Sequence, residues 1–313
     1  MMREPLSTRE KYYRTYRIVR FLLRRGSLFS APKNLSDALS DTNTIPRRAY
    51  TIITINSVFF FILAYLLMFL ITEFATAISA SAFDIPTIIY YYDIDYYQQR
   101  SSDWTADQVI AIFSTGPLIS LLLWIALFSL YVYVADDPGI LRLLVIWMLL
   151  FATVNFFGEI LVGAILNEGF GYVIWYLFIM DTGRIIITLL GFITLFSIGL
   201  LFSRLFMFSA NIYFNDLHSG NRRKFIFSQF ILPYFIGCLI LFLVKLPVIN
   251  VFEISLFGSM ILILIPISLR GLFIQDLYFD EEPRKIKIST YFVLGTILLL
   301  VAFRIVFGIG VWI

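Results

Sequence analysis

The sequence has little of the residue types on which buried chemistry depends. Its 313 residues include one histidine, His218, and one cysteine, Cys238. A single cysteine excludes an intrachain disulfide, and a single histidine excludes a histidine metal cluster within one chain. The chain also lacks the His-Glu-x-x-His, Gly-x-x-x-x-Gly-Lys and Gly-x-Ser-x-Gly motifs of zinc proteases, phosphate loops and serine hydrolases. We therefore expect a protein that is not an enzyme and holds no metal or cofactor.

Charge is scarce as well, and apolar residues are abundant. Only 14% of the residues are charged and 60% are hydrophobic, against roughly 25% and about 45–50% in a soluble domain. An apolar run of about 20 residues spans the bilayer as a helix. The sequence therefore predicts an all-α, polytopic transmembrane bundle that contacts lipid and does not bind nucleic acid.

Seven apolar windows are long enough to cross the membrane, and together they form a predicted transmembrane domain over residues 49–313. Polar breaks separate each window from the next. The predicted spans are Ala49 to Glu73, Gln108 to Val134, Ile140 to Leu166, Arg184 to Ala210, Phe225 to Lys245, Val251 to Ile274 and Ile288 to Ile313.

The distribution of charge between these windows predicts an orientation. Residues 1–48 hold eleven basic and four acidic residues, whereas the connector from Ala75 to Ala106 is acidic apart from Arg100. Short loops rich in Lys and Arg stay on the cytoplasmic side. This predicts a cytoplasmic N-terminus and an extracytoplasmic C-terminus, and we expect the protein in the cytoplasmic (inner) membrane of a bacterium.

One further apolar segment, Phe170 to Met180, is too short to span. Tyr172, Trp175 and Tyr176 suit the level of the lipid headgroups. The segment is predicted either as a helix lying in the interface or as a re-entrant loop, which would need a buried polar neighbourhood.

The N-terminal region, residues 1–48, is predicted to be a basic cytoplasmic segment with one amphipathic helix. At 100° per residue, the helix from Lys11 to Arg25 places its tyrosines and aliphatic residues on one face and its arginines on the other. Such a helix lies on the inner leaflet and binds anionic lipids; docking to an acidic partner is the alternative. The predicted lipid contacts are Arg14, Arg17, Arg20 and Arg24.

The first outer connector contains the tyrosine-rich, acidic stretch IIYYYDIDYYQQRSSDW. Its composition is typical of protein contacts, and packing on the protein's own helices is the alternative. A cation site at Asp93 and Asp95 has only two carboxylates, too few to define a cage for a hard cation.

Glu159 lies inside an apolar window and costs about 2.5–3.5 kcal/mol at the bilayer centre, so we expect it to face the protein interior. Asn155, Glu159 and Gly163 recur every four residues and predict a polar face that meets other helices. Arg304 lies at a similar depth, about 24–26 Å along its helix at 1.5 Å per residue. We predict a buried ion pair between Glu159 and Arg304, which either fixes the packing of the third and seventh spans or belongs to an ion path.

Prolines inside three windows, Pro117, Pro233 and Pro266, predict helix kinks, and broken helices often build transporter sites. The chain has 33 phenylalanines and only 17 glycines, which favours a static, ring-rich body over helices that slide. The sequence therefore predicts a structural or accessory subunit of a membrane assembly with partner subunits. The alternative is a small secondary transporter or channel with its site near Glu159 and Asn155.

Overall fold

A computed structural model of the chain describes residues 47–97, 104–134, 140–274, 277–279 and 286–313. The predicted basic helix near the N-terminus lies outside the described residues, and with it lie the four predicted lipid contacts Arg14, Arg17, Arg20 and Arg24.

The described part of the chain has seven helical spans long and apolar enough to cross a membrane, as the sequence predicts. A helix satisfies every backbone donor and acceptor internally, which hydrocarbon requires. The prediction of an all-α, polytopic bundle is confirmed, and the chain is an integral membrane protein. The spans are Arg47–Ser81, Ala106–Tyr133, Leu141–Leu166, Asp181–Ile212, Gly220–Lys245, Val251–Leu272 and Thr290–Ile309.

Several spans are built from more than one element, because short π-helical or 3-10 turns interrupt the α-helix. Two spans contain a five-residue π-helical turn, labelled η2 and η4. In chain order the elements are α2 (Arg47–Ser81), β1 (Thr87–Ile89), β2 (Ile94–Tyr96), α3 (Ala106–Val134), α4 (Leu141–Thr153), η2 (Val154–Gly158), α5 (Glu159–Leu166), α6 (Phe170–Tyr176), α7 (Asp181–Phe208), η3 (Ser209–Ile212), β3 (Asp216–Leu217), α8 (Ser219–Ile226), η4 (Phe227–Ile231), α9 (Leu232–Lys245), α10 (Val251–Leu272), β4 (Leu277–Tyr278), α11 (Thr290–Ile309) and β5 (Val311–Trp312).

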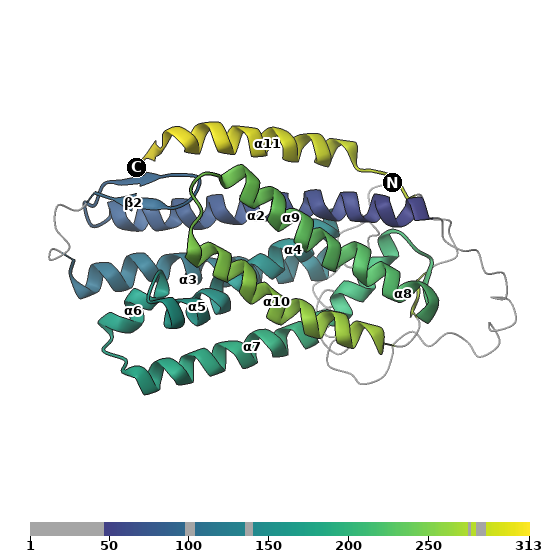
Figure 1. Cartoon of the computed structure of the whole chain (residues 1–313), viewed down its shortest axis with the longest axis horizontal. Coiled ribbons are helices and arrows are strands. Elements are labelled where there is room, and N and C mark those ends of the chain that lie inside the picture. The colour runs from purple at the N-terminus through teal and green to yellow at the C-terminus, as the bar shows by residue number, and fades with distance from the viewer. Residues whose placement is uncertain (1–46, 98–103, 135–139, 275–276, 280–285) are drawn as a thin grey trace, which may run out of the picture.

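The long helices run side by side, with α2 packed against α3, α4, α9 and α11 (Figure 1). Helix α11 lies on the outside of α2, and only three of its side chains, Thr296, Phe303 and Phe307, are buried. On another side of the bundle, α7 packs against α10 over a long interface. Gly199 permits this approach, since a Cβ atom there would lie 2.5 Å from the carbonyl oxygen of Ile263.

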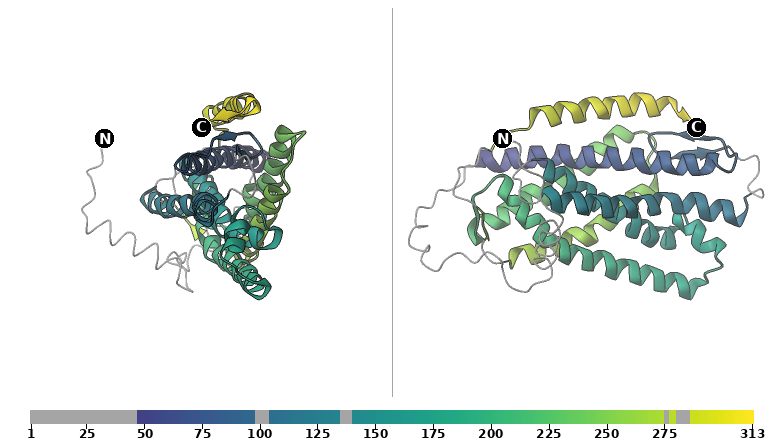
Figure 2. Two further views of the ribbon diagram at one scale, coloured as in Figure 1. Left: turned by 90° about the vertical axis from the view of Figure 1, so that its left-hand side faces the viewer. Right: turned by 180° about the vertical axis from the view of Figure 1, so that it is seen from behind.

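The two ends of the bundle differ. One end of the bundle holds the start of α2 and helix α8 (Figures 1 and 2). The other end holds α6, the β1–β2 hairpin and the end of α11. We call the second the hairpin end. There the strands form an antiparallel sheet of order β2-β1-β5, in which Ile89 pairs with Ile94 and Val311. The tyrosine-rich connector thus packs on its own chain and on the C-terminal strand.

Two local features bear on the sequence expectation. Helix α2 continues to Ser81, so Glu73 lies inside the helix and does not mark its end. The short apolar segment forms the seven-residue helix α6, which packs against α3 and α5. At this contact, a Cβ atom on Gly171 would lie 2.3 Å from the carbonyl oxygen of Gly163, so the two glycines let α6 lie directly against α5.

Candidate functional site

A cavity of about 700 Å³ lies within the helices near the hairpin end. Its lining comes from α2, α3, the η2–α5 region, α10 and three loops: the hairpin, the α5–α6 turn and the α9–α10 connection. A cavity of this size is typical of sites for organic ligands, which run from about 300 to 1,000 Å³. We call it the acidic cavity, for the side chains described next.

Five carboxylates line the acidic cavity, and none of its lining residues, all within the described part of the chain, is Lys, Arg or His. Two of the carboxylates are exposed and lie in loops, whereas the other three lie on helices and are half-buried. Carboxyl groups therefore extend from the loops into the bundle. The five are Asp93 and Glu168 in the loops, and Glu73, Glu159 and Glu253 on the helices.

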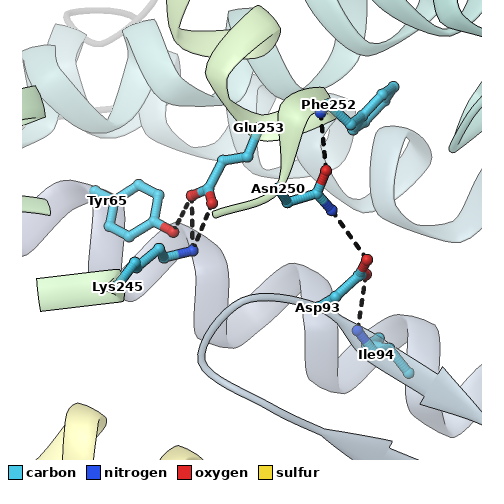
Figure 3. A network of polar contacts seen from close by, with 7 residues as sticks. All are labelled: Tyr65, Asp93, Ile94, Lys245, Asn250, Phe252 and Glu253. Carbon is cyan, nitrogen blue, oxygen red and sulfur yellow. Dashed lines mark hydrogen bonds and ion pairs between the residues drawn. The ribbon is translucent and has the colours of Figure 1, made fainter. Parts of the chain in front are cut away.

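Glu253 is neutralised by Lys245, the last residue of α9. The Lys245 Nζ atom lies 2.7 Å from both carboxylate oxygens of Glu253, and the two side chains are 2% and 15% exposed (Figure 3). The hydroxyl of Tyr65 also donates to Glu253. The ammonium group lies 5.3 Å from the ring centroid of Tyr65 and 4.9 Å from that of Phe69, within the range of a cation–π interaction.

Asn250 joins the α9–α10 loop to the hairpin. Its side-chain oxygen accepts from the backbone N–H of Phe252 at 2.8 Å and caps the first turn of α10. Its Nδ2 donates to Asp93 at 2.9 Å, and Asp93 also accepts from the backbone N–H of Ile94 at 2.8 Å (Figure 3). The hairpin is thereby held against the start of α10, at the border of the acidic cavity.

Asp93 titrates in an unusual range for an aspartate. Burial raises its pKa to about 6, the Ile94 N–H opposes the rise, and the carboxylates of Asp95 and Glu253 add to it. Its side chain is exposed but lines the cavity, so the protein around it disfavours the charged form. Burial likewise raises the pKa of Tyr96 well above its usual range, with a further contribution from Glu73, Asp93 and Glu159.

Glu73 and Glu159 have no hydrogen-bond or ion-pair partner within the described part of the chain. Glu159 points toward Gly116 of α3, since a Cβ atom added at Gly116 would lie 3.8 Å from Oε2 of Glu159. The same Cβ atom would lie 3.6 Å from Oγ1 of Thr76 on α2. Glu73 and Thr76 are three residues apart on α2 and share a helix face. Glu159 therefore borders the space beside Gly116, and Glu73 lines the same cavity from α2.

The π-helical turn η2 lies directly before Glu159 and contains Asn155, which also lines the cavity. A π-helical turn widens the helix by one residue and is frequent at functional sites. The same turn packs against α10, where a Cβ atom on Gly158 would lie 2.6 Å from the hydroxyl oxygen of Ser259. Asn155 and Glu159 thus share one polar wall, as their spacing predicts.

Aromatic rings separate the cavity from the rest of the bundle. Tyr65, Phe151 and Phe257 line it, and the ring of Phe61 packs against each of Phe151 and Phe257. Phe61 also contacts Trp147, whose indole N–H donates to Ser57 at 3.0 Å. These buried rings form a floor beneath the carboxylates.

The predicted ion pair between Glu159 and Arg304 is not formed. The Cζ atom of Arg304 lies 3.9 Å from the ring centroid of Tyr91, and its Nη2 donates to the carbonyl of Leu246 at 3.1 Å. Helix α11 packs on α2, whereas α5 packs on α6, α7 and α10. Equal depth in the membrane therefore did not make the two residues neighbours.

The remaining predicted residues have the following positions. Pro117 and Pro266 lie inside α3 and α10, and Pro233 is at the start of α9, immediately after the π-helical turn η4. Gly163 packs against Gly171 and does not line the cavity. His218 is exposed and caps α8.

Sequence reasoning missed Glu73 and Glu168 as parts of a site, because each was read as the boundary of an apolar run. Sequence reasoning also missed the ion pair between Lys245 and Glu253. Their mutual pairing could have been found, since two antiparallel helices joined by a short loop bring the residues on either side of the loop together.

The architecture and the acidic cavity define an integral, multi-pass membrane protein with an ionisable site inside its helical bundle. No family model, curated protein or solved structure matches this chain.

Proposed function

We propose that the protein is a small secondary transporter or channel whose solute site is the acidic cavity. The observation that carries the proposal is the presence of five carboxylates around a cavity of about 700 Å³ inside an apolar helical bundle. Ionisable residues within a membrane are costly and usually mark the route of a substrate or ion.

The floor of rings favours a transporter over an open channel. A continuous pore needs polar lining along its whole length, whereas Phe61, Phe151 and Phe257 pack beneath the cavity. Broken helices beside a midplane site are typical of transporters. Here the π-helical turn η2 and Pro117, which follows Gly116, supply such irregularities next to Glu159.

The proposed orientation places the acidic cavity on the extracytoplasmic side of a bacterial inner membrane. The opposite end of the bundle carries Arg47, Arg48, Arg223 and Lys224, which suits the cytoplasmic face. Anionic lipids of the inner leaflet are the proposed partners of the basic N-terminal segment.

Cysteine accessibility tests whether the cavity opens to one side. In a Cys238→Ser background, Asn155→Cys should react in right-side-out vesicles with a membrane-impermeant thiol reagent. Leu122→Cys, at a position on α3 that is 61% exposed and apolar, should not react because lipid covers it. Failure of Asn155→Cys to react from either side would refute a water-accessible site.

Transport itself is tested in proteoliposomes with a panel of labelled cationic, neutral and anionic solutes. Saturable uptake that is lost in Glu159→Gln, but kept in Asp107→Asn at the exposed first turn of α3, is the expected result. A folded, reconstituted protein that takes up none of the panel would contradict the proposal.

The other candidate is a structural or accessory subunit of a membrane assembly. It is favoured by α11, which buries three side chains and leaves a broad apolar face toward the membrane. Lipid covers such a face equally well, so purification in mild detergent followed by mass spectrometry of stoichiometric partners is the distinguishing measurement.

A further inference from the structure

We propose that the acidic cavity binds an organic cation with an alkylammonium head, held by Glu159 and Glu73 and by the aromatic rings beside them. The inference rests on the proposed function, because it names the class of solute that the site takes. The charge, the size and the geometry of the cavity point to this class, and so does the ammonium group of Lys245, which the chain itself places against two lining residues.

The sign of the charge excludes anions. Of the five lining carboxylates, Glu253 is paired with Lys245, and Asp93 is bonded to Asn250. Glu73, Glu159 and the exposed Glu168 have no side-chain partner in the described part of the chain, and no lining residue carries a positive charge. When ionised, the two carboxylates on the helices repel an anionic solute and stabilise a cationic one in this low-dielectric setting.

Size and coordination exclude a bare metal ion as the best-fitting occupant. Among the described residues, no three His, Cys, Asp or Glu side chains converge in a way that could hold a metal ion. A hard cation such as Ca²⁺ needs about six to eight oxygen ligands at roughly 2.3–2.6 Å. The cavity of about 700 Å³ instead matches an organic molecule.

Lys245 demonstrates how this site stabilises an ammonium group. Its Nζ lies 2.7 Å from both oxygens of Glu253 and 4.9 Å from the ring centroid of Phe69, and both of these residues line the cavity. A carboxylate supplies the opposite charge, and the ring face supplies a cation–π contact. Two residues of the lining therefore already bind a primary alkylammonium, which belongs to Lys245 of α9 and lies behind the lining.

A second set of groups of the same kind surrounds the unpaired carboxylates. Three rings that line the cavity pack together: the centroid of Phe113 lies 5.6 Å from that of Tyr96 and 5.0 Å from that of Tyr172. Phe113 precedes Gly116 by one helical turn on α3, and Gly116 faces Glu159. A free ammonium head at Glu159 would thus lie near the ring of Phe113, and the apolar lining would cover its hydrocarbon body.

The test measures binding to the purified protein in lipid nanodiscs by isothermal titration calorimetry. The probes are 2-phenylethylammonium, its neutral analogue 2-phenylethanol, the anion phenylacetate, and the chlorides of potassium and magnesium. We expect the ammonium compound to bind and the alcohol and the anion to bind at least about tenfold more weakly. Glu159→Gln should weaken ammonium binding by about ten- to hundredfold, the usual effect of losing one charge-assisted contact.

Two further variants guard against loss of fold as the cause. Asp107→Asn removes a carboxylate at the same end of the bundle but outside the cavity lining, and it should bind like the wild type. Gly116→Leu keeps every charge and fills the space beside Glu159, so it should abolish binding while the thermal unfolding transition is retained. The inference would be overturned if the ammonium compound and the alcohol bound with equal affinity. It would also be overturned if ammonium binding were unchanged in both Glu159→Gln and Gly116→Leu, or if only magnesium or potassium bound.

The outcomes also separate this inference from the proposed function. Glu159-dependent ammonium binding without uptake into proteoliposomes would refute transport and leave the ligand class standing. Saturable uptake of a neutral or anionic solute, with no ammonium binding, would refute the ligand class and leave transport standing.

Discussion

Replacing Lys245 with methionine keeps the length of the side chain but removes the ammonium group that neutralises Glu253. The lysine side chain is only 2% exposed and the glutamate 15%, so water can replace little of the lost interaction. Tyr65 remains as a hydrogen-bond donor to Glu253 but cannot supply a positive charge. The variant therefore leaves an uncompensated carboxylate in a low-dielectric region.

Removing one partner of a buried ion pair costs about 3–5 kcal/mol. The remaining bond from Tyr65 places Lys245→Met near the lower value, at about 3 kcal/mol. Replacing both partners, as in Lys245→Met with Glu253→Met, removes the stranded charge and should cost no more than about 1 kcal/mol, because well-packed apolar groups substitute for such pairs with little loss.

The assay is reversible unfolding in mixed micelles of a mild detergent and dodecyl sulfate, followed by circular dichroism. Lys287→Met, at an exposed position, is the matched control and should change the unfolding free energy by less than about 0.5 kcal/mol. The reasoning is refuted if Lys245→Met lies within about 1 kcal/mol of the wild type, or if the double variant is no more stable than the single one.

Three further predictions concern packing, pH and the C-terminal strand. A Cβ atom on Gly237 would lie 2.2 Å from a ring carbon of Phe61, so Gly237→Ala should lower the unfolding free energy by about 1–3 kcal/mol. At Gly258 an added Cβ atom would meet no atom within 4 Å, so Gly258→Ala should raise the unfolding free energy by roughly 0.5–1 kcal/mol. Burial raises the pKa of Asp93 from 3.8 to about 6, so the folded state binds the proton more tightly than the unfolded state. Stability measured by thermal unfolding should therefore fall as pH rises from about 4 to about 6. Asp93→Asn should flatten this dependence. Truncation after α11 removes β5 and the backbone hydrogen bonds between residues 87 and 313. The amide of Thr87 should then exchange faster with deuterium. An unchanged exchange rate would show that the C-terminal strand does not protect this amide.

The spanning helices could be predicted because hydrophobicity over about 20 residues is a local property of the sequence. Each predicted window overlaps one observed span, and the largest difference is at α2, which continues past Glu73 to Ser81. A charged residue ends an apolar window in a hydropathy scan, but a helix continues through it when the side chain faces a polar cavity.

The acidic cavity could not be predicted in the same way, because its carboxylates come from elements far apart in the chain. Asn155 and Glu159 of the predicted polar face both line the cavity, but nothing local shows that Glu73 of α2 borders the same space. The strands at the hairpin end also had a signal: the Ile- and Tyr-rich composition around residues 87–96 is typical of strands. It was read only as a contact surface.

The sign of the stability change in Glu159→Gln distinguishes the ion pair expected from the sequence from the arrangement in the structure. If Glu159 were paired with Arg304 in the bundle, its neutralisation would strand the guanidinium and cost about 3–5 kcal/mol. In the structure Arg304 is bonded to Leu246 and lies over Tyr91, and Glu159 has no partner among the described residues.

A half-buried carboxylate without a partner costs free energy, up to the roughly 2.5–3.5 kcal/mol of a charge at the bilayer centre. Glu159→Gln should therefore raise the unfolding free energy, by about 1 kcal/mol given that the side chain is partly hydrated within the cavity. The same variant should lose ligand binding. A gain in stability together with a loss of binding is expected where a residue serves a functional site at a cost in stability. A loss of several kcal/mol in the micelle unfolding assay, reversed by a second substitution at Arg304, would instead show that the two residues are coupled.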